Sequence, residues 1–222
     1  MEFRLLNADE IDCRISSVGK WGIQLLLYKD ARVDMNILDE TFGVFGWQRK
    51  HKLIDGKLFC SVGVYDPKLN CWVWKQDVGV ESYTEKEKGQ ASDAFKRACF
   101  NIGIGRELYT APQMFVRPDY LQTLTQDNGR WTCKDYFVVT DIQYAGRKIA
   151  SVTIWNTRTG ASLEFKNDVP QTIGKIKAQA LETLCKEKGI KVEVLLNNYK
   201  VASLADLTEE QHLNAIRRLE KS

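Results

Sequence analysis

The stretch over residues 77–105 constrains the fold of this 222-residue chain more than any other part. It combines the end of a strand, a turn and a helix whose first turn carries a capping box, in which Thr84 and Glu87 satisfy each other's free backbone donors. Gly103 and Gly105 are placed to end the helix. The stretch therefore predicts a helix that follows directly on a strand.

The predicted helix has two different faces when its residues are projected at 100° each. An adjacent lysine and arginine beside an aromatic ring suit a sugar-phosphate backbone and a base plane. The ordinary alternative is a solvated surface on which Asp93 pairs with Arg97 and Lys96, and the helix alone favours this alternative. The apolar stripe expected to face the core is Ala91, Phe95, Ala98 and Ile102, flanked by Ala94 and Cys99. The opposite face carries Lys86, Asp93, Lys96, Arg97 and Phe100.

Composition limits the classes of protein to consider. A hydrophobic content of 44% suffices for one core and a small second module, and a net charge of +3 means that a polyanion site depends on local clustering. The six cysteines lie far apart without a CxxC pair, so we expect reduced core thiols and a cytoplasmic protein. The sequence has no apolar run of about 20 residues, no nucleotide-binding loop and no histidine in a metal or triad spacing. We therefore expect no membrane span, no cofactor, no metal and no enzymatic activity.

Three consecutive strands are predicted before the helix, over residues 46–54, 57–65 and 71–80. Asp55-Gly56 between the first two is the strongest short hairpin signal. The predicted fold class is therefore α+β, with an antiparallel meander packed on a helix. Upstream, a strand is predicted over residues 21–28 and a helix over about residues 30–42.

Basic residues collect on the meander and its helix. Residues 44–112 contain 11 lysines and arginines against eight acidic residues, whereas residues 1–43 contain five against eight. In the first strand, alternation directs Arg49 to one face and Lys50 and Lys52 to the other. This run either protects a sheet edge or contacts nucleic acid, and it supports both interpretations equally.

A second meander is predicted over residues 136–144, 148–155 and 161–165, after a polar stretch over residues 119–129 that we expect to be a mobile loop. The meander either extends the first sheet or forms a projecting hairpin. After a linker at residues 167–170, the pattern becomes helical.

Three helices are predicted at the C-terminal end, and the third begins with a capping box of Thr208 and Gln211. This divides the chain into a domain of residues 1–167 and a three-helix module of residues 168–222, whose mixed charges are more typical of a docking module than of a DNA clamp. The residues of the third helix expected to point inward are Leu213, Ile216 and Leu219.

Several short motifs over about residues 30–112 carry a resemblance to a known family. They are, in order, Phe42-Gly43, Gly46-Trp47, Ser61-Val62-Gly63-Val64, Asp77-Val78-Gly79, and Lys88-Gly89-Gln90-Ala91-Ser92-Asp93-Ala94-Phe95-Lys96-Arg97-Ala98 running into Gly103. In order and spacing they resemble the Rad-fifty-two superfamily of single-strand annealing proteins, and most of all its short prokaryotic and phage versions, the Sak type. The Asp-x-x-Lys-Arg-Ala helix after a Val-Gly strand is a fairly specific part of this pattern.

The resemblance implies a β-β-β-α core in a protein that needs no ATP and assembles into homo-oligomeric rings or helical filaments. It also implies that single-stranded DNA lies in a positively charged groove around the outside. In that family the Lys-Arg pair of the helix holds the DNA backbone, which carries over to Lys96 and Arg97. Arg32 is the nearest match to a further basic contact before the first matched helix, although its spacing to Phe42 differs by one residue.

Weaker, outer DNA contacts follow from the same resemblance. A lysine in the turn between the second and third strands makes such a contact in the family, and Lys68 occupies that position here. The loop before the helix is shorter than in eukaryotic members, so Lys86 or Lys88 either replaces another outer contact or only lies near it. The outer set also includes Arg49, Lys50 and Lys52. Residues 168–222 resemble the tails of phage recombinases, which dock a host single-strand-binding protein or a partner exonuclease.

The expected function is ATP-independent binding of single-stranded DNA and annealing of complementary strands in homologous recombination and double-strand break repair. One alternative is an end-protection protein of the same fold that binds single strands without annealing them. The other is a metal-dependent nuclease using Asp77, Glu81 and Asp93, which no paired-carboxylate motif supports. The aromatic residues that either stack on bases or belong to the core or a subunit interface are Tyr65, Trp72, Trp74 and Phe100.

Overall fold

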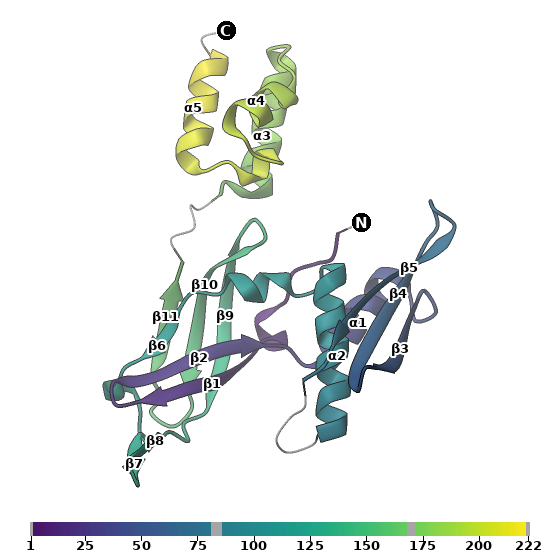
Figure 1. The fold of residues 1–222 in the computed structure, drawn as a ribbon. Helices are drawn as coiled ribbons and strands as arrows, with labels where there is room; N and C mark the ends of the chain where they lie inside the picture. The colour runs from purple at the N-terminus through teal and green to yellow at the C-terminus, as the bar shows by residue number, and fades with distance from the viewer. Residues whose placement is uncertain (1, 81–85, 168–171, 221–222) are drawn as a thin grey trace.

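The computed structural model describes residues 2–80, 86–167 and 172–220 of the chain (Figure 1). Within these ranges the chain forms five α-helices and antiparallel β-sheets, which is a mixed α+β architecture. A six-stranded sheet and a three-stranded sheet lie on either side of the helices α1 and α2 (Figure 1). The helices are α1 Ala31–Phe42, α2 Lys86–Ile102, α3 Gly174–Glu187, α4 Val192–Tyr199 and α5 Glu209–Glu220, with short 3-10 helices η1 Ala8–Glu10, η2 Arg106–Thr110, η3 Pro118–Tyr120 and η4 Leu204–Asp206.

The six-stranded sheet has the strand order β11-β10-β9-β1-β2-β6. In its N-terminal hairpin, β1 places Cys13 opposite Leu27 of β2, and both side chains are buried. The strand β1 joins the second meander where Asp12 pairs with Val138. The second meander therefore extends the sheet of the N-terminal hairpin and not the sheet of the first meander, so neither predicted arrangement is correct. The strands are β1 Asp12–Gly19, β2 Gly22–Tyr28, β6 Met114–Val116, β9 Phe137–Ala145, β10 Lys148–Asn156 and β11 Ser162–Lys166.

The three-stranded sheet is the predicted first meander, with the order β3-β4-β5. Its strands are β3 Trp47–Ile54, β4 Lys57–Asp66 and β5 Cys71–Val78. The hairpin at Asp55-Gly56 is confirmed, because both residues have positive φ angles, 49° and 74°, as a type I′ turn requires. One face of this sheet packs on α2, and the other face is directed away from the helices (Figure 1).

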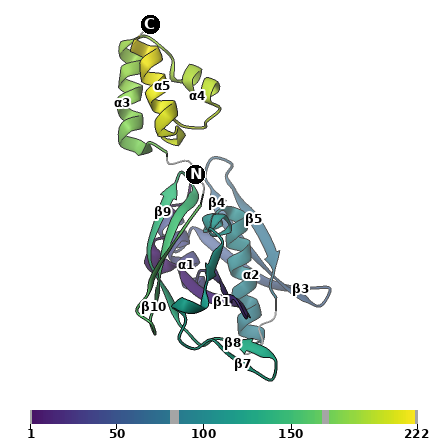
Figure 2. The same cartoon turned by 90° about the vertical axis from the view of Figure 1, so that its left-hand side faces the viewer.

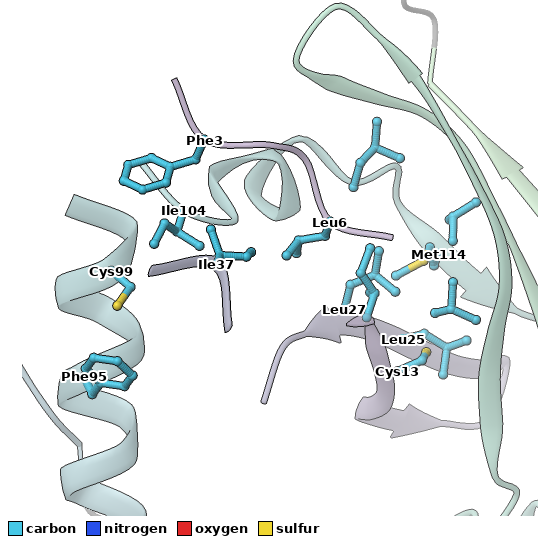
Figure 3. Close-up of a cluster of buried hydrophobic side chains, with 14 of the residues drawn as sticks. Phe3, Leu6, Cys13, Leu25, Leu27, Ile37, Phe95, Cys99, Ile104 and Met114 are labelled. Atoms are coloured by element: carbon cyan, nitrogen blue, oxygen red, sulfur yellow. The ribbon is translucent and has the colours of Figure 1, made fainter. Parts of the chain in front are cut away.

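Helix α2 buries the predicted apolar stripe. Phe95 and Cys99 belong to a hydrophobic cluster that continues through Ile37 of α1 to Leu25 of β2 (Figure 3). Gly79 allows the preceding strand to approach the helix, because a Cβ atom there would lie 2.1 Å from the carbonyl oxygen of Gln90. The stripe residues that are fully buried are Ala94, Phe95, Ala98 and Cys99, whereas Ala91 and Ile102 are half-buried. The predicted N-cap residue, Thr84, lies outside the described residues.

The polar stretch over residues 119–129 contains regular secondary structure, contrary to our prediction of a loop. Its end forms a small hairpin of β7 Thr125–Asp127 and β8 Arg130–Thr132, with Asn128 and Gly129 at positive φ. Asp135 supports the segment from behind by accepting hydrogen bonds from the backbone nitrogens of Gln122, at 2.9 Å, and Thr123, at 3.0 Å. A polar composition thus hid an Asn-Gly hairpin.

The three C-terminal helices pack together around their own hydrophobic cluster, beyond the end of the sheets (Figures 1 and 2). The capping box of α5 is confirmed: the backbone nitrogen of Thr208 donates to Gln211 Oε1 at 2.9 Å, and the backbone nitrogen of Gln211 donates to Thr208 Oγ1 at 3.2 Å. The predicted inward position of Leu213 is wrong, because its side chain is 53% exposed. The helix is rotated so that its buried residues are His212, Ala215 and Leu219, with Ile216 half-buried.

All six cysteines are free thiols, and four of them are buried as predicted. Burial raises the pKa of the Cys13 thiol to about 12 and that of Cys60 to about 11. Cys71 differs because it is exposed at the start of β5. None of the helices in the described ranges is long and apolar enough to cross a membrane.

Candidate nucleic-acid interface

A groove of about 880 Å³ runs between α2 and the β1–β2 hairpin. The hairpin contributes Leu26 and Tyr28, α2 contributes Ser92 and Phe100, and Tyr109 comes from the 3-10 helix η2. In the described part of its lining, the accessible cations Arg14, Lys96 and Arg97 face a single carboxylate, that of Asp93, while a fourth cation, Lys29, is buried. This balance gives the groove the electrostatic character of an anion-binding surface.

Lys96 lies on the groove side of α2 and is half-buried. Its charge acts on Asp30, just before α1: a hydrogen bond from Arg32 lowers the pKa of Asp30 most, and Lys96 adds a smaller electrostatic lowering. Lys96 is therefore close enough to Asp30 to interact with its carboxylate, and its side chain is partly exposed in the groove.

Arg97 also lines the groove, with 42% of its side chain exposed. Its Nε lies 3.4 Å from Asp77 Oδ1, a contact that lacks hydrogen-bond geometry. The predicted pairing with Asp93 is therefore wrong for Arg97, because β5 brings Asp77 under the helix and Asp93 Oδ2 instead accepts the backbone N–H of Val80 at 2.9 Å. A half-exposed pair of this kind contributes little to stability, so Arg97 can exchange its partner for a phosphate at small cost.

Arg32, predicted as a contact in the DNA groove, is not part of the groove lining. Asp30 caps α1 by accepting from the backbone nitrogen of Arg32 at 2.8 Å and from Arg32 Nε at 2.9 Å. The Arg32 side chain is 82% exposed. Arg32 and Lys96 thus both act on Asp30, but only Lys96 reaches the groove itself.

A buried ion pair, which the sequence analysis missed, forms the floor of the groove. Lys29 Nζ pairs with Asp34 Oδ1, both side chains are at most 1% exposed, and Asp34 Oδ2 has no hydrogen-bond partner. Burial raises the pKa of Asp34 to about 6, against a smaller lowering by Lys29. Gly105 makes room for the lysine, since a Cβ atom there would lie 2.5 Å from Lys29 Cε. The only signal in the sequence was a lysine that directly follows an apolar strand.

The Phe100 ring lies over Lys29 of this ion pair, and the Tyr109 ring packs against Phe100. Lys29 Nζ is 4.2 Å from the ring centroid of Phe100, and the Phe100 and Tyr109 ring centroids are 4.8 Å apart. Tyr109 is 73% exposed, and the sequence analysis did not single it out. The groove therefore combines cations with an accessible aromatic face.

The face of the three-stranded sheet directed away from α2, here called the outer face, carries a second group of cations and aromatic rings. Lys50 Nζ lies 4.6 Å from the Trp74 ring centroid, and Trp72 lies 6.1 Å from Trp74 and 5.7 Å from Tyr65. Lys52 is two residues from Lys50 on β3, and side chains two residues apart on a strand lie on the same face of the sheet. These three aromatic rings are therefore not part of the core beneath α2.

The predicted alternation of the basic run in β3 is confirmed. Arg49 points toward α2, where its guanidinium lies 5.0 Å from the Phe95 ring centroid, and His51 Nε2 lies 3.2 Å from the carbonyl oxygen of Ala91. Of the other predicted outer residues, Lys68 is exposed in the turn between β4 and β5, and Lys88 is exposed near the start of α2. Lys86 is the first residue of α2, and its side chain lies outside the described part of the chain.

Of the three acidic residues considered for a nuclease, the two that the structure describes are engaged in other contacts. Asp77 contacts Arg97 and Asn101, Asp93 caps the backbone of Val80, and Glu81 lies outside the described residues. Across the described residues, no group of three or more His, Cys, Asp or Glu side chains is arranged to hold a metal ion.

Neither a scan against protein-family models nor a search of curated protein sequences finds a match to this chain.

Proposed function

We propose that this chain binds single-stranded DNA in the groove between α2 and the β1–β2 hairpin and anneals complementary strands without ATP. The observation that carries the proposal is the two-sided character of α2. One side of the helix is buried through Phe95 and Cys99, and the other presents Lys96 and Arg97 to a groove in which Arg14 adds a third cation. A Rad-fifty-two-like β-β-β-α arrangement is part of the same proposal, supported by the packing of the β3–β5 meander on α2.

Annealing in this scheme is non-covalent. Cations that contact phosphates hold a strand without reading its sequence, and the affinity falls as salt is added because bound counterions are released. If several protomers repeat the contact along one strand, binding becomes much tighter than at one site. A strand that is already ordered has lost conformational entropy, so a complementary strand pairs with it more readily.

Assembly into a ring or filament is proposed on the free edges of the three-stranded sheet. Among the described strands, β3 and β5 each pair only with β4, so each presents unpaired backbone groups to a second copy of the chain. The C-terminal helices expose Ile176, at 85%, and Leu213, at 53%, and these apolar side chains suit docking of a single-strand-binding protein or an exonuclease. The proposed compartment is the cytoplasm.

The deciding experiment mixes two complementary labelled oligonucleotides with the protein, without nucleotide, and measures annealing together with the native mass of the same sample. Fast annealing by a large oligomer is the expected result. Tight binding without annealing would replace annealing with end protection, and absence of both binding and assembly would refute the proposal. Divalent-cation-dependent cleavage of the labelled strands would instead support a nuclease.

A further inference from the structure

The groove contains an aromatic ring that is exposed yet firmly supported. Tyr109 is 73% exposed, and Phe100 packs against it with the ring centroids 4.8 Å apart. Phe100 itself lies over Lys29, which is fixed by its buried pair with Asp34. An isolated exposed aromatic residue needs no explanation, but Tyr109 packs on a ring that a buried ion pair supports, and this contact restricts its orientation.

The backbone that carries Tyr109 is also tied down on both sides. Arg106 donates from Nε to the carbonyl oxygen of Phe100 at 2.6 Å, which joins η2 to the end of α2. Thr110 Oγ1 accepts the backbone N–H of Ile149 at 2.9 Å, which joins η2 to β10. Buried Glu107 accepts the backbone N–H of Leu6 at 2.8 Å. Little conformational freedom therefore remains for the backbone to lose when a ligand stacks on Tyr109.

The Phe100 ring that supports Tyr109 lies beside two cations of the groove on α2. Phe100 follows Lys96 by four residues and Arg97 by three, so all three lie on neighbouring turns of one helix face. A ligand that uses this arrangement fully has several negative charges and a flat aromatic group beside them. A single-stranded polynucleotide has both, whereas an apolar peptide would leave the cations unpaired.

We propose that Tyr109, held by Phe100, is the base-stacking position of the groove, so that the groove binds a nucleobase as well as the phosphates. This inference rests on the proposed function and extends it, because it states that single-strand affinity has a part that depends on the presence of bases. Stacking on one aromatic face does not distinguish bases, since every base has a π face. The effect of Tyr109 is therefore independent of sequence.

The test measures binding of the full chain to two labelled strands of equal length, an oligothymidylate and a strand of abasic sites with the same phosphates. The wild-type chain is expected to bind the thymidylate strand about tenfold more tightly than the abasic strand. Tyr109→Ala is expected to weaken binding of the thymidylate strand about tenfold and to leave the abasic strand unaffected, with an unchanged salt dependence. Tyr109→Phe is expected to bind both strands as the wild type does.

Two controls separate stacking from other effects. Tyr120→Ala removes a 39% exposed tyrosine that does not line the groove, and it is expected to change neither affinity. Lys96→Ala is expected to weaken both strands equally, because it removes a phosphate contact. Equal affinities of the wild type for the two strands, or a Tyr109→Ala variant that weakens both or neither, would overturn the stacking inference and leave the proposed function standing. Failure of the wild type to bind either strand would overturn both.

Discussion

The groove and the outer face each bring a lysine close to an aromatic ring, and they use this contact differently. In the groove, Lys29 lies 4.2 Å from the Phe100 ring centroid and is buried in an ion pair. On the outer face, exposed Lys50 lies 4.6 Å from the Trp74 ring centroid. The same two chemical groups therefore form a rigid support in one region and an open, solvated surface in the other. Burial, and not the identity of the groups, decides which role they take.

The largest expected effect is the loss of stability when the buried lysine of the groove is replaced, compared with the exposed lysine of the outer face. Lys29→Met leaves Asp34 buried without its cation and is expected to lower the free energy of unfolding by about 3–5 kcal/mol. Adding Asp34→Leu removes the unpaired charge and is expected to restore much of the loss. Lys50→Met is the matched change on the outer face and is expected to cost less than about 1 kcal/mol. Urea unfolding of the four chains measures the effects, and equal losses for the two single methionine variants would contradict the comparison.

The burial of Asp34 in the groove is also expected to make the free energy of unfolding depend on pH, with a smaller effect than that of Lys29→Met. The pKa of Asp34 is raised from 3.8 to about 6 by burial. Between these pH values the folded chain holds a proton that the unfolded chain has released, so this contribution to stability is fully present below about pH 4 and is lost as the pH rises to about 6. The difference in unfolding free energy between the wild type and Asp34→Asn is therefore expected to fall over this pH range and to level off above it. A difference that rises with pH would show that the ion pair outweighs burial.

The groove and the outer face are also expected to contribute differently to the affinity for a first DNA strand. Lys96→Ala combined with Arg97→Ala removes two groove cations and is expected to weaken single-strand binding about 100-fold near 0.1 M salt, and to reduce the slope of log affinity against log salt by about 1.4. Folding and assembly are expected to persist, since both side chains lie off the buried stripe. Lys175→Ala with Lys191→Ala removes the same charge from exposed positions near the C-terminal end and serves as the control. A groove variant that binds like this control would refute the site.

The outer face is expected to act on the second strand. Lys50→Ala combined with Lys52→Ala leaves the groove intact, so binding of one strand is expected to change less than about threefold, while the rate of annealing to a complementary strand falls several-fold because the second strand is attracted less. Annealing rates at saturating first strand, at low and high salt, measure this. A loss of first-strand binding as large as that of the groove variant would remove the distinction between the two regions.

The smallest expected effect comes from removing residues 168–222. The hydrophobic cluster that supports the groove contains no residue of this segment, and the C-terminal helices have a cluster of their own. A chain ending at residue 167 is therefore expected to bind and anneal DNA as the full chain does, and to lose only partner-dependent recombination. Loss of annealing in the shortened chain would show that the C-terminal helices contribute to one of the two surfaces.

Sequence reasoning succeeded where the signal was local and periodic. The Asp55-Gly56 hairpin, the alternation of Arg49 and Lys50, and the capping box at Thr208 follow from spacings of one to four residues. It failed at α5, where Leu213 and His212 both fit a helical stripe and packing selected His212 as the buried residue. It also failed at residues 119–129, where the short strands β7 and β8 are too polar to show an apolar alternation.

By itself, the sequence determined the first meander, the helix that follows it and the two faces of that helix, because backbone geometry couples residues one to four positions apart. Only the tertiary structure decided that the second meander joins the N-terminal hairpin, that Arg97 contacts Asp77, and that Lys29 is buried with Asp34 and lies at the Phe100 ring. Each of these depends on which distant segments meet. Strand pairing and burial between such segments are set by the packing of the whole core, and no local pattern records them.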